Sequence, residues 1–133
     1  MKITYEEYLL EPKSISIEKM HLLHKQILDE ICGDNEAEEL YGDLIECATR
    51  YADFRANWFL WDRETRIERD ASRTSCHNSL IVKFNMLARY LHLQGKHTAW
   101  RDDLGYETDD KYTRKTIGDF ACYLVFINSI HAR

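Results

Sequence analysis

The chain has 133 residues, of which 44% are hydrophobic and 31% charged, with five glycines and a single proline. This length fits one domain over residues 1–133, and the apolar content is too high for a disordered protein. The sequence has no apolar run of 18 residues, which excludes a membrane span, and its N-terminus carries acidic residues where a secretion signal would have an apolar core.

Charge is distributed unevenly along the chain. Residues 1–62 contain 14 acidic and 6 basic residues, whereas residues 63–101 contain 8 basic and 3 acidic residues. The net charge of −5 argues against non-specific binding of nucleic acid, which depends on many cationic contacts to phosphate. The basic middle either binds one anionic ligand or pairs with the acidic first half, and we favour the second because surfaces of mixed sign are the usual soluble arrangement.

The four cysteines favour a reduced, cytoplasmic protein. Cys32, Cys47, Cys76 and Cys122 are 15, 29 and 46 positions apart, and none has the C-x₂-C spacing of a zinc ribbon or a thioredoxin motif. Cys47 and Cys122 lie in apolar helical stretches, where a free cysteine packs as a small hydrophobic residue.

Two helices are predicted before residue 34. Residues 4–7 resemble a capping box and open a short helix that must end before Pro12. The second helix begins near Ser16 and ends at Cys32, with Gly33 as its C-terminal cap. Its apolar residues recur at helical steps of three or four: Ile17, Met20, Leu23, Ile27 and Ile31.

The third helix begins at a second capping sequence, residues 35–38, and its apolar stripe continues to Trp61. This stripe has seven members at helical steps: Leu40, Leu44, Cys47, Tyr51, Phe54, Trp58 and Trp61. Residues 63–70 are almost purely polar, so we expect a helix end, a kink or a protruding arm there.

The fourth helix is predicted over residues 74–94, ending at Gly95, with a core stripe at Leu80, Phe84, Leu87 and Leu91. Extending that stripe towards the N-terminus by helical steps reaches His77 and Arg73. Polar residues that continue a buried face are typical of a functional site or of a buried polar network.

A single capped turn is expected over residues 98–105, followed by a polar loop and a last helix that starts after Asp109 or Asp110. Residues 120–130 are apolar on nearly every side, so this helix must be covered all round, either centrally in the fold or in an oligomer. The aromatic residues exceed what one small bundle must bury, which favours a homodimer. Without any alternating strand pattern or repeat, the sequence predicts a single all-α domain, a four-helix bundle with additional short helices.

Four strings in the second half carry a resemblance to a known family. They are residues 77–81 (HNSLI), 85–90 (NMLARY), 100–105 (WRDDLG) and 117–122 (IGDFAC). Over residues 73–133 the chain resembles a family of small uncharacterised helical proteins of Gram-positive bacteria and their mobile elements. The resemblance implies a bacterial cytoplasmic protein, an accessory or anti-defence factor of an integrated element, and it carries over no catalytic residue.

An arginine–histidine cluster is the main candidate site. Arg66, Arg69, Arg73 and His77 recur at steps of three and four, so a continuous helix would place them on one ridge. Three further residues could close around an anion there, because guanidinium groups bind carboxylate or phosphate bidentately and stack on aromatic rings: Arg89, Trp100 and Arg101. The alternative is that these arginines pair with nearby carboxylates on a solvated surface.

A magnesium-dependent nucleotide pyrophosphohydrolase is the alternative function. Glu36, Glu39, Asp43 and Glu46 share one helix face, and carboxylates are the ligands that Mg²⁺ prefers. That class of all-α enzyme also needs a second acidic set on a facing helix, for which the sequence offers only scattered residues: Asp53, Asp62 and Glu64 or Asp119. Acidic residues at a helix N-terminus are common because they complement the helix dipole.

Other chemistry has weaker support in the sequence. His21 and His24 could form half of a zinc site with Cys32 or Glu30, but no complete ligand pattern exists. A helix-turn-helix would bring the acidic residues of 63–73 against DNA phosphates. There is no glycine-rich phosphate loop and no nucleophile elbow. We therefore expect a non-catalytic protein without metal or cofactor that binds a protein or a small anionic ligand.

Overall fold

A computed structural model describes residues 13–58, 60–104 and 111–131, all of whose regular elements are helices. They are α2 (Ile17–Ile31), α3 (Asn35–Trp58), α4 (Arg63–Leu93), α5 (Ala99–Leu104) and α6 (Lys111–His131). The prediction of an all-α fold is confirmed. The helix predicted before Pro12 and the closure of the turn at Gly105 lie outside the described residues.

Local capping explains where α2 and α3 begin. The Ser16 hydroxyl accepts a hydrogen bond from the backbone N–H of Lys19 at 3.1 Å, as an N-cap residue does. Asp34 caps α3 in the same way, accepting from the N–H of Ala37 at 3.1 Å. Between them Gly33 has a φ of +80°, the left-handed conformation that commonly ends a helix. The predicted start at Ser16 and the glycine cap are confirmed, and α2 ends one residue before the predicted Cys32.

The long helix α4 corrects the predicted start of the fourth helix. It begins at Arg63 rather than near residue 74, because Asp62 accepts a hydrogen bond from the N–H of Thr65 at 2.8 Å and caps it. The polar stretch 63–73 is therefore the first third of α4. Apolar periodicity could not reveal it, since this part of the helix extends beyond the main core.

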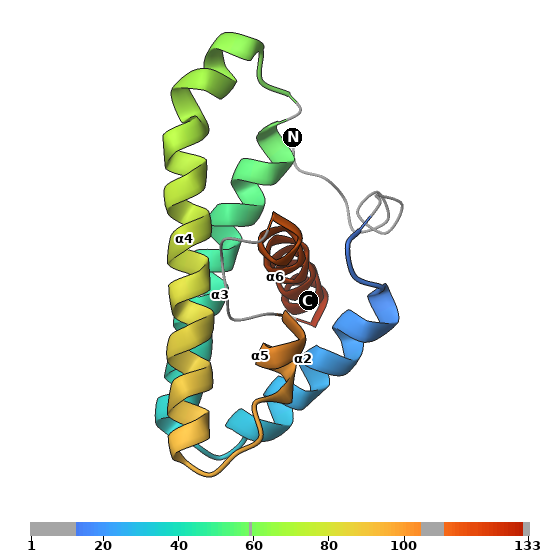
Figure 1. The fold of residues 1–133 in the computed structure, drawn as a ribbon, viewed down its shortest axis with the longest axis vertical. Helices are drawn as coiled ribbons and strands as arrows, with labels where there is room; N and C mark the ends of the chain where they lie inside the picture. The colour runs from blue at the N-terminus through green and yellow to red at the C-terminus, as the bar shows by residue number, and fades with distance from the viewer. Residues whose placement is uncertain (1–12, 59, 105–110, 132–133) are drawn as a thin grey trace.

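The helices α3 and α4 form a long antiparallel hairpin whose tip projects beyond the rest of the molecule (Figure 1). In the same view α6 is seen nearly end-on, between the hairpin on one side and α2 with α5 on the other. The helix α6 therefore runs across the hairpin instead of alongside it. The four main helices are present, but the finer prediction of a four-helix bundle is not confirmed.

The core lies where α6 meets the other helices. Its residues from Ile117 to Leu124 are buried, so within the described chain α6 is covered by its own neighbours, as predicted for a helix that is apolar all round. At the centre the ring of Phe84 lies 5.9 Å from that of Phe120 and 6.3 Å from that of Trp100. Among the described residues no helix is long and apolar enough to cross a membrane.

Candidate functional site: the tip of the α3–α4 hairpin

Arginine and tryptophan side chains stack at the projecting end of the hairpin. The guanidinium of Arg73 lies 4.3 Å from the ring centre of Trp58, and that of Arg66 lies 5.9 Å from the same ring. Arg69 lies 5.4 Å from the ring centre of Trp61. These distances are within the range of cation–π contacts, about 6 Å. The predicted ridge of arginines therefore faces two indoles, and we call these five residues the arginine–tryptophan tip.

The turn between the helices holds the two indoles in place. The backbone N–H groups of Leu60 and Trp61 donate to the carbonyl of Asn57, at 2.9 and 3.2 Å. The Nε of Arg66 donates to the carbonyl of Trp58 at 2.7 Å, which satisfies an acceptor left open at the end of α3. The ring of Trp61 then packs edge-on against Phe54 (5.9 Å) and Trp58 (6.2 Å).

The tip arginines have few carboxylate partners. Of the three tip arginines only Arg73 forms an ion pair within the described part of the chain, with Asp70 at 3.1 Å, and both side chains are substantially exposed. Exposed pairs of this kind contribute little to stability. Arg66 and Arg69 instead stack on rings, and stacking occupies the flat face of a guanidinium while its edge can still donate to an anion.

The predicted pairing of the basic middle with the acidic first half is not seen as ion pairs among the residues that the structure describes, although Lys96 interacts electrostatically with Glu30 and Asp34. None of the ion pairs there joins residues 63–101 to residues 1–62; they are Lys19–Asp103, Arg55–Asp119, Arg73–Asp70 and Lys115–Asp119.

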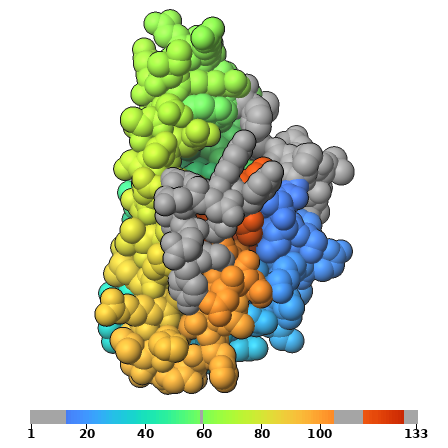
Figure 2. Space-filling model, viewed as in Figure 1, coloured from blue at the N-terminus to red at the C-terminus, as the bar shows by residue number. Residues whose placement is uncertain are grey.

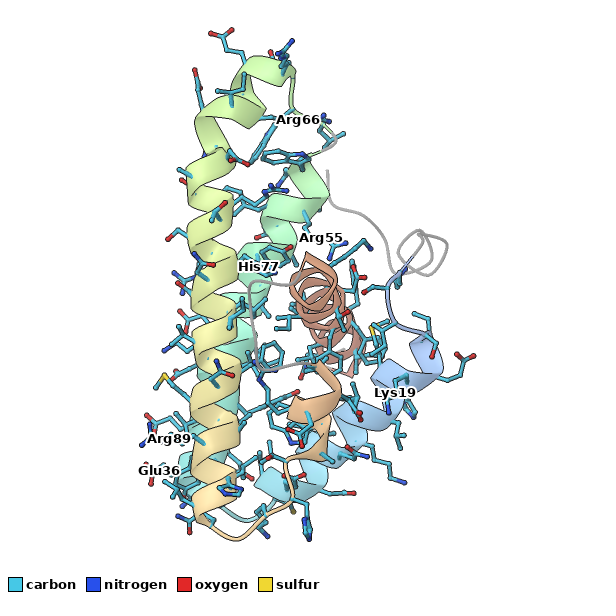
Figure 3. The ribbon with its side chains drawn as sticks, in the orientation of Figure 1. Lys19, Glu36, Arg55, Arg66, His77 and Arg89 are labelled. Atoms are coloured by element: carbon cyan, nitrogen blue, oxygen red, sulfur yellow. The ribbon has the colours of Figure 1, made fainter. Side chains whose placement is uncertain are left out.

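A shallow hollow lies beside the tip on the α4 side. It measures about 270 Å³ and is lined by Trp58, Arg63, Arg66, Ile67 and Asp70. The side chain of Ile67 is 67% exposed, and Leu60 in the adjoining turn is 54% exposed. Figure 3 shows Arg66 at this projecting end, beyond Arg55 and His77 and at the opposite end of the hairpin from Glu36 and Arg89. The tip therefore combines cationic, aromatic and aliphatic surface.

His77 is not part of the tip. It lies further along α4, is buried, and packs edge-on against the ring of Tyr51 on α3 at 5.1 Å (Figure 3). His77, which continues the predicted core stripe, thus joins the two helices of the hairpin through its contact with Tyr51.

The structure also separates Arg89, Trp100 and Arg101 from the tip. Arg89 is exposed and lies 23 residues after Arg66 on the same helix, which is about 34 Å. Trp100 and Arg101 are fully buried near the far end of the hairpin. They bond to Glu30 and Asn85: Trp100 Nε1 donates to Glu30 at 3.4 Å, and Arg101 Nε to Asn85 Oδ1 at 2.8 Å. Their predicted closure around one anion with the ridge is therefore wrong.

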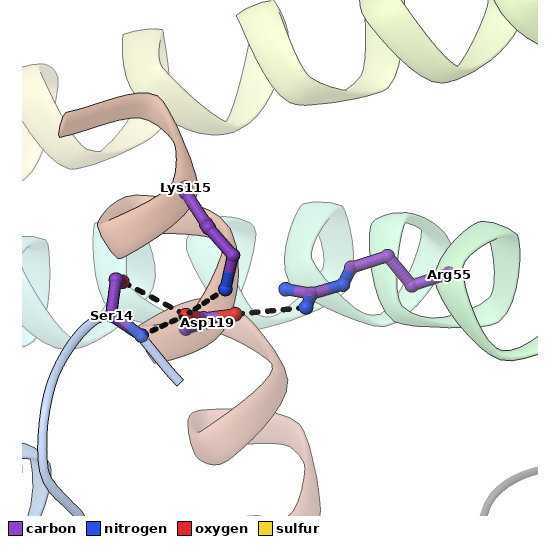
Figure 4. Close-up of polar contacts among 4 residues, drawn as sticks. All are labelled: Ser14, Arg55, Lys115 and Asp119. Atoms are coloured by element: carbon purple, nitrogen blue, oxygen red, sulfur yellow. Dashed lines mark hydrogen bonds and ion pairs between the residues drawn. The ribbon is translucent and has the colours of Figure 1, made fainter. Parts of the chain in front are cut away.

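A buried carboxylate network lies on α6 (Figure 4). Asp119 is fully buried and accepts from the backbone N–H and the hydroxyl of Ser14, both at 2.9 Å. It also forms ion pairs with Arg55 at 2.8 Å and Lys115 at 3.2 Å. Burial raises the pKa of Asp119, but the Ser14 N–H and the Arg55 charge lower it more, so the pKa lies below its usual value.

In the sequence Asp119 is only one of the scattered carboxylates that could complete a magnesium site. An acidic residue within an otherwise apolar helix was the available signal, but its partners lie 64 and 105 positions away. Because four donors already occupy this carboxylate, it serves to hold Ser14, α3 and α6 together.

The acidic face predicted for magnesium lies exposed on α3. Glu36, Glu39, Asp43 and Glu46 all point to solvent. Within the described ranges no group of three or more His, Cys, Asp or Glu side chains is placed to hold a metal ion. The two histidines of α2 contact tyrosines instead: His21 Nδ1 lies 3.2 Å from the Tyr123 hydroxyl, and His24 Nε2 lies 3.4 Å from that of Tyr41.

No family model, curated protein or solved structure matches the chain. The resemblance of residues 73–133 to a family of Gram-positive bacteria stays a prediction. The geometry of the hairpin tip is accordingly the basis for a functional proposal.

Proposed function

We propose that this protein is a non-catalytic binding protein that captures an acidic segment of another protein at the arginine–tryptophan tip. The observation that carries the proposal is the state of Arg66 and Arg69. Both are stacked on indoles at the projecting end of the hairpin, and neither has a carboxylate partner among the described residues.

The tip offers the contacts that such a segment would use. Stacking on a ring restricts a guanidinium before binding, so less side-chain entropy is lost when it donates two hydrogen bonds to a carboxylate. Leu60 and Ile67 add exposed apolar surface beside the charges. Tryptophan and arginine are also the residues that most often dominate the energetics of protein interfaces.

The shape of the site favours a protein over a small anionic ligand. The hollow of about 270 Å³ is open and shallow, whereas pockets for small molecules usually enclose roughly 300–1,000 Å³. A role as an accessory or anti-defence factor of a bacterial mobile element is a further proposal, supported only by the resemblance of residues 73–133.

Selection of random peptides on the immobilised protein tests the proposal. We expect enriched peptides to carry Asp or Glu next to a large apolar residue. Binding of a selected peptide, followed by fluorescence anisotropy, should weaken about tenfold or more when Arg66 and Arg69 are both changed to Gln. Arg50→Gln, an exposed arginine of α3 outside the tip, is the matched control and should leave binding unchanged. Peptides without acidic residues, or equal binding by the double variant, would contradict the proposal.

A further inference from the structure

The outer face of α4, opposite its buried face, has no neighbour among the described helices. Exposed residues recur along it at steps of three or four: Glu68, Ala71, Ser75, Asn78, Val82, Met86, Arg89 and Leu93. Three are large and apolar, with Val82 53%, Met86 44% and Leu93 71% exposed. Figure 2 shows α4 as a continuous column along one edge of the molecule. A stripe of this period on an exposed helix is typical of a helix–helix interface.

The side chains in the two halves of this stripe differ in size. The first half has the small side chains of Ala71 and Ser75, and a shallow groove of about 460 Å³ runs over them as far as Val82. The second half has the large side chains of Val82 and Met86. Small residues leave room for large ones when helices pack, so each half is suited to receive the other.

We propose that the outer face of α4 binds the same face of a second copy of this chain, with the two helices antiparallel and a two-fold axis between Asn78 and Ser79. This axis places Ser75 opposite the second copy's Val82. It also places Ala71 opposite the second copy's Met86. A two-fold interface of this kind is closed, because each contact occurs twice and no binding surface is left over.

Charge selects the antiparallel arrangement. The same axis places Glu68 opposite the second copy's Arg89, and neither residue has an ion pair within the described chain. A parallel pairing in register would instead place Glu68 against Glu68 and Arg89 against Arg89. Like charges across an interface are unfavourable, whereas opposite charges fix its register.

The antiparallel pair also determines where the two arginine–tryptophan tips lie. Arg66 would lie 25 helical positions from the second copy's Arg66, which is about 38 Å along the helix axis. The dimer would thus carry its two tips at opposite ends. This consequence rests on the proposed function of the tip, whereas the pairing of α4 does not.

Sedimentation velocity of the full-length protein and two variants tests the interface. We expect a concentration-dependent dimer for the wild type. Val82→Glu should raise its dissociation constant at least about tenfold. Leu22→Glu on α2 is the matched control, since Leu22 is 47% exposed and lies outside α4, and it should leave the constant unchanged. A monomeric wild type, or equal effects of the two variants, would overturn the proposal.

Charge reversal tests the antiparallel register. Glu68→Arg and Arg89→Glu should each weaken the dimer, and the double variant should restore it, because opposite charges face each other again. A parallel dimer would show no such restoration, and that result would overturn the arrangement. Both experiments measure only the association of two chains. A negative result would therefore rule out the dimer without bearing on peptide binding at the tip, which has a separate test.

Discussion

Asp119 shows how one buried charge can organise several elements of an otherwise apolar core. Its carboxylate accepts from Ser14 before α2, from Arg55 on α3 and from Lys115 on its own helix. Apolar contacts tolerate sliding, whereas a carboxylate with four donors is satisfied in only one arrangement of these elements. We infer that the network fixes how the chain before α2 docks onto α6.

Replacing Asp119 by Asn should lower the free energy of unfolding by about 3 kcal/mol at neutral pH, because the half-buried Arg55 would lose its counter-charge and the buried donors their carboxylate. The folded-state pKa of Asp119 is depressed, so its stabilisation is present above the unfolded-state pKa and is lost as pH falls through the folded-state pKa. Urea unfolding at neutral and acidic pH measures both effects, and the loss at Asp119→Asn should shrink in acid. Asp103→Asn, which breaks an exposed pair with Lys19, is the control and should have little effect. Equal losses of stability in Asp119→Asn and Asp103→Asn would contradict the stabilising role of the Asp119 network.

Two helical glycines offer a matched pair of substitutions. A Cβ at Gly118 would lie 2.8 Å from the hydroxyl of Tyr51, whereas a Cβ at Gly42 meets nothing within 4 Å. Gly118→Ala should therefore destabilise the fold by about 1–3 kcal/mol through overpacking. Gly42→Ala should stabilise it by about 0.5–1 kcal/mol through helix propensity. Urea unfolding of the two variants measures this, and effects of the same sign would show that α6 does not approach Tyr51 so closely.

At the scale of the element, two different sets of contacts stabilise the two parts of α4. From Leu80 to Leu91 its inner face is buried in the core. From Arg63 to Arg73 it is held by the Asp62 cap and by stacking on Trp58 and Trp61, with no fully buried apolar residue. Stability within a structure follows the density of such buried contacts, so the first third of α4 should open more readily than the rest.

Hydrogen exchange should reveal this difference within one helix. We expect amides of residues 66–73 to exchange faster than those of residues 80–91. Trp58→Ala should accelerate the first group about tenfold further, because it removes the stacks of both Arg66 and Arg73, each about 0.5–1 kcal/mol. The second group should respond less, since it packs on the core. Uniform protection along α4, or no response to Trp58→Ala, would contradict this account of the tip.

The helices and most of their ends were predictable because both depend on residues close in sequence, whereas the start of α4 at Arg63 was not, since its first third has no apolar stripe. Helical steps place Arg66, Arg69 and Arg73 on one ridge whatever the tertiary fold. The positions of Trp100 and Arg101 depend instead on how the chain turns after Gly95, and no local pattern specifies that turn. For the same reason periodicity showed that Asp119 lies on a helix, but not that Ser14 and Arg55 would surround it.

At the scale of the whole molecule, the structure changes the reason for expecting a homodimer. In the sequence the grounds for a homodimer are the large number of aromatic residues and the last helix, which is apolar on nearly every side. The structure buries residues 117–124 of α6 within its own chain and stacks the indoles against arginines. Among the exposed apolar residues, which also include Leu22 and Leu28 on α2, those in our proposed dimer are Val82, Met86 and Leu93 on the outer face of α4.

Dimerisation through α4 should link thermal stability to protein concentration. A partner that binds only the folded chain stabilises it by mass action, so the Tm of the wild type should rise by roughly 2–3 °C for each tenfold increase in concentration. Val82→Glu should abolish this dependence without moving the Tm measured at high dilution, because Val82 makes its contacts with the second copy. Differential scanning fluorimetry over three decades of concentration measures both. A wild-type Tm independent of concentration would show that α4 has no such partner, and a Val82→Glu variant unstable even at high dilution would show that Val82 serves the fold of the single chain.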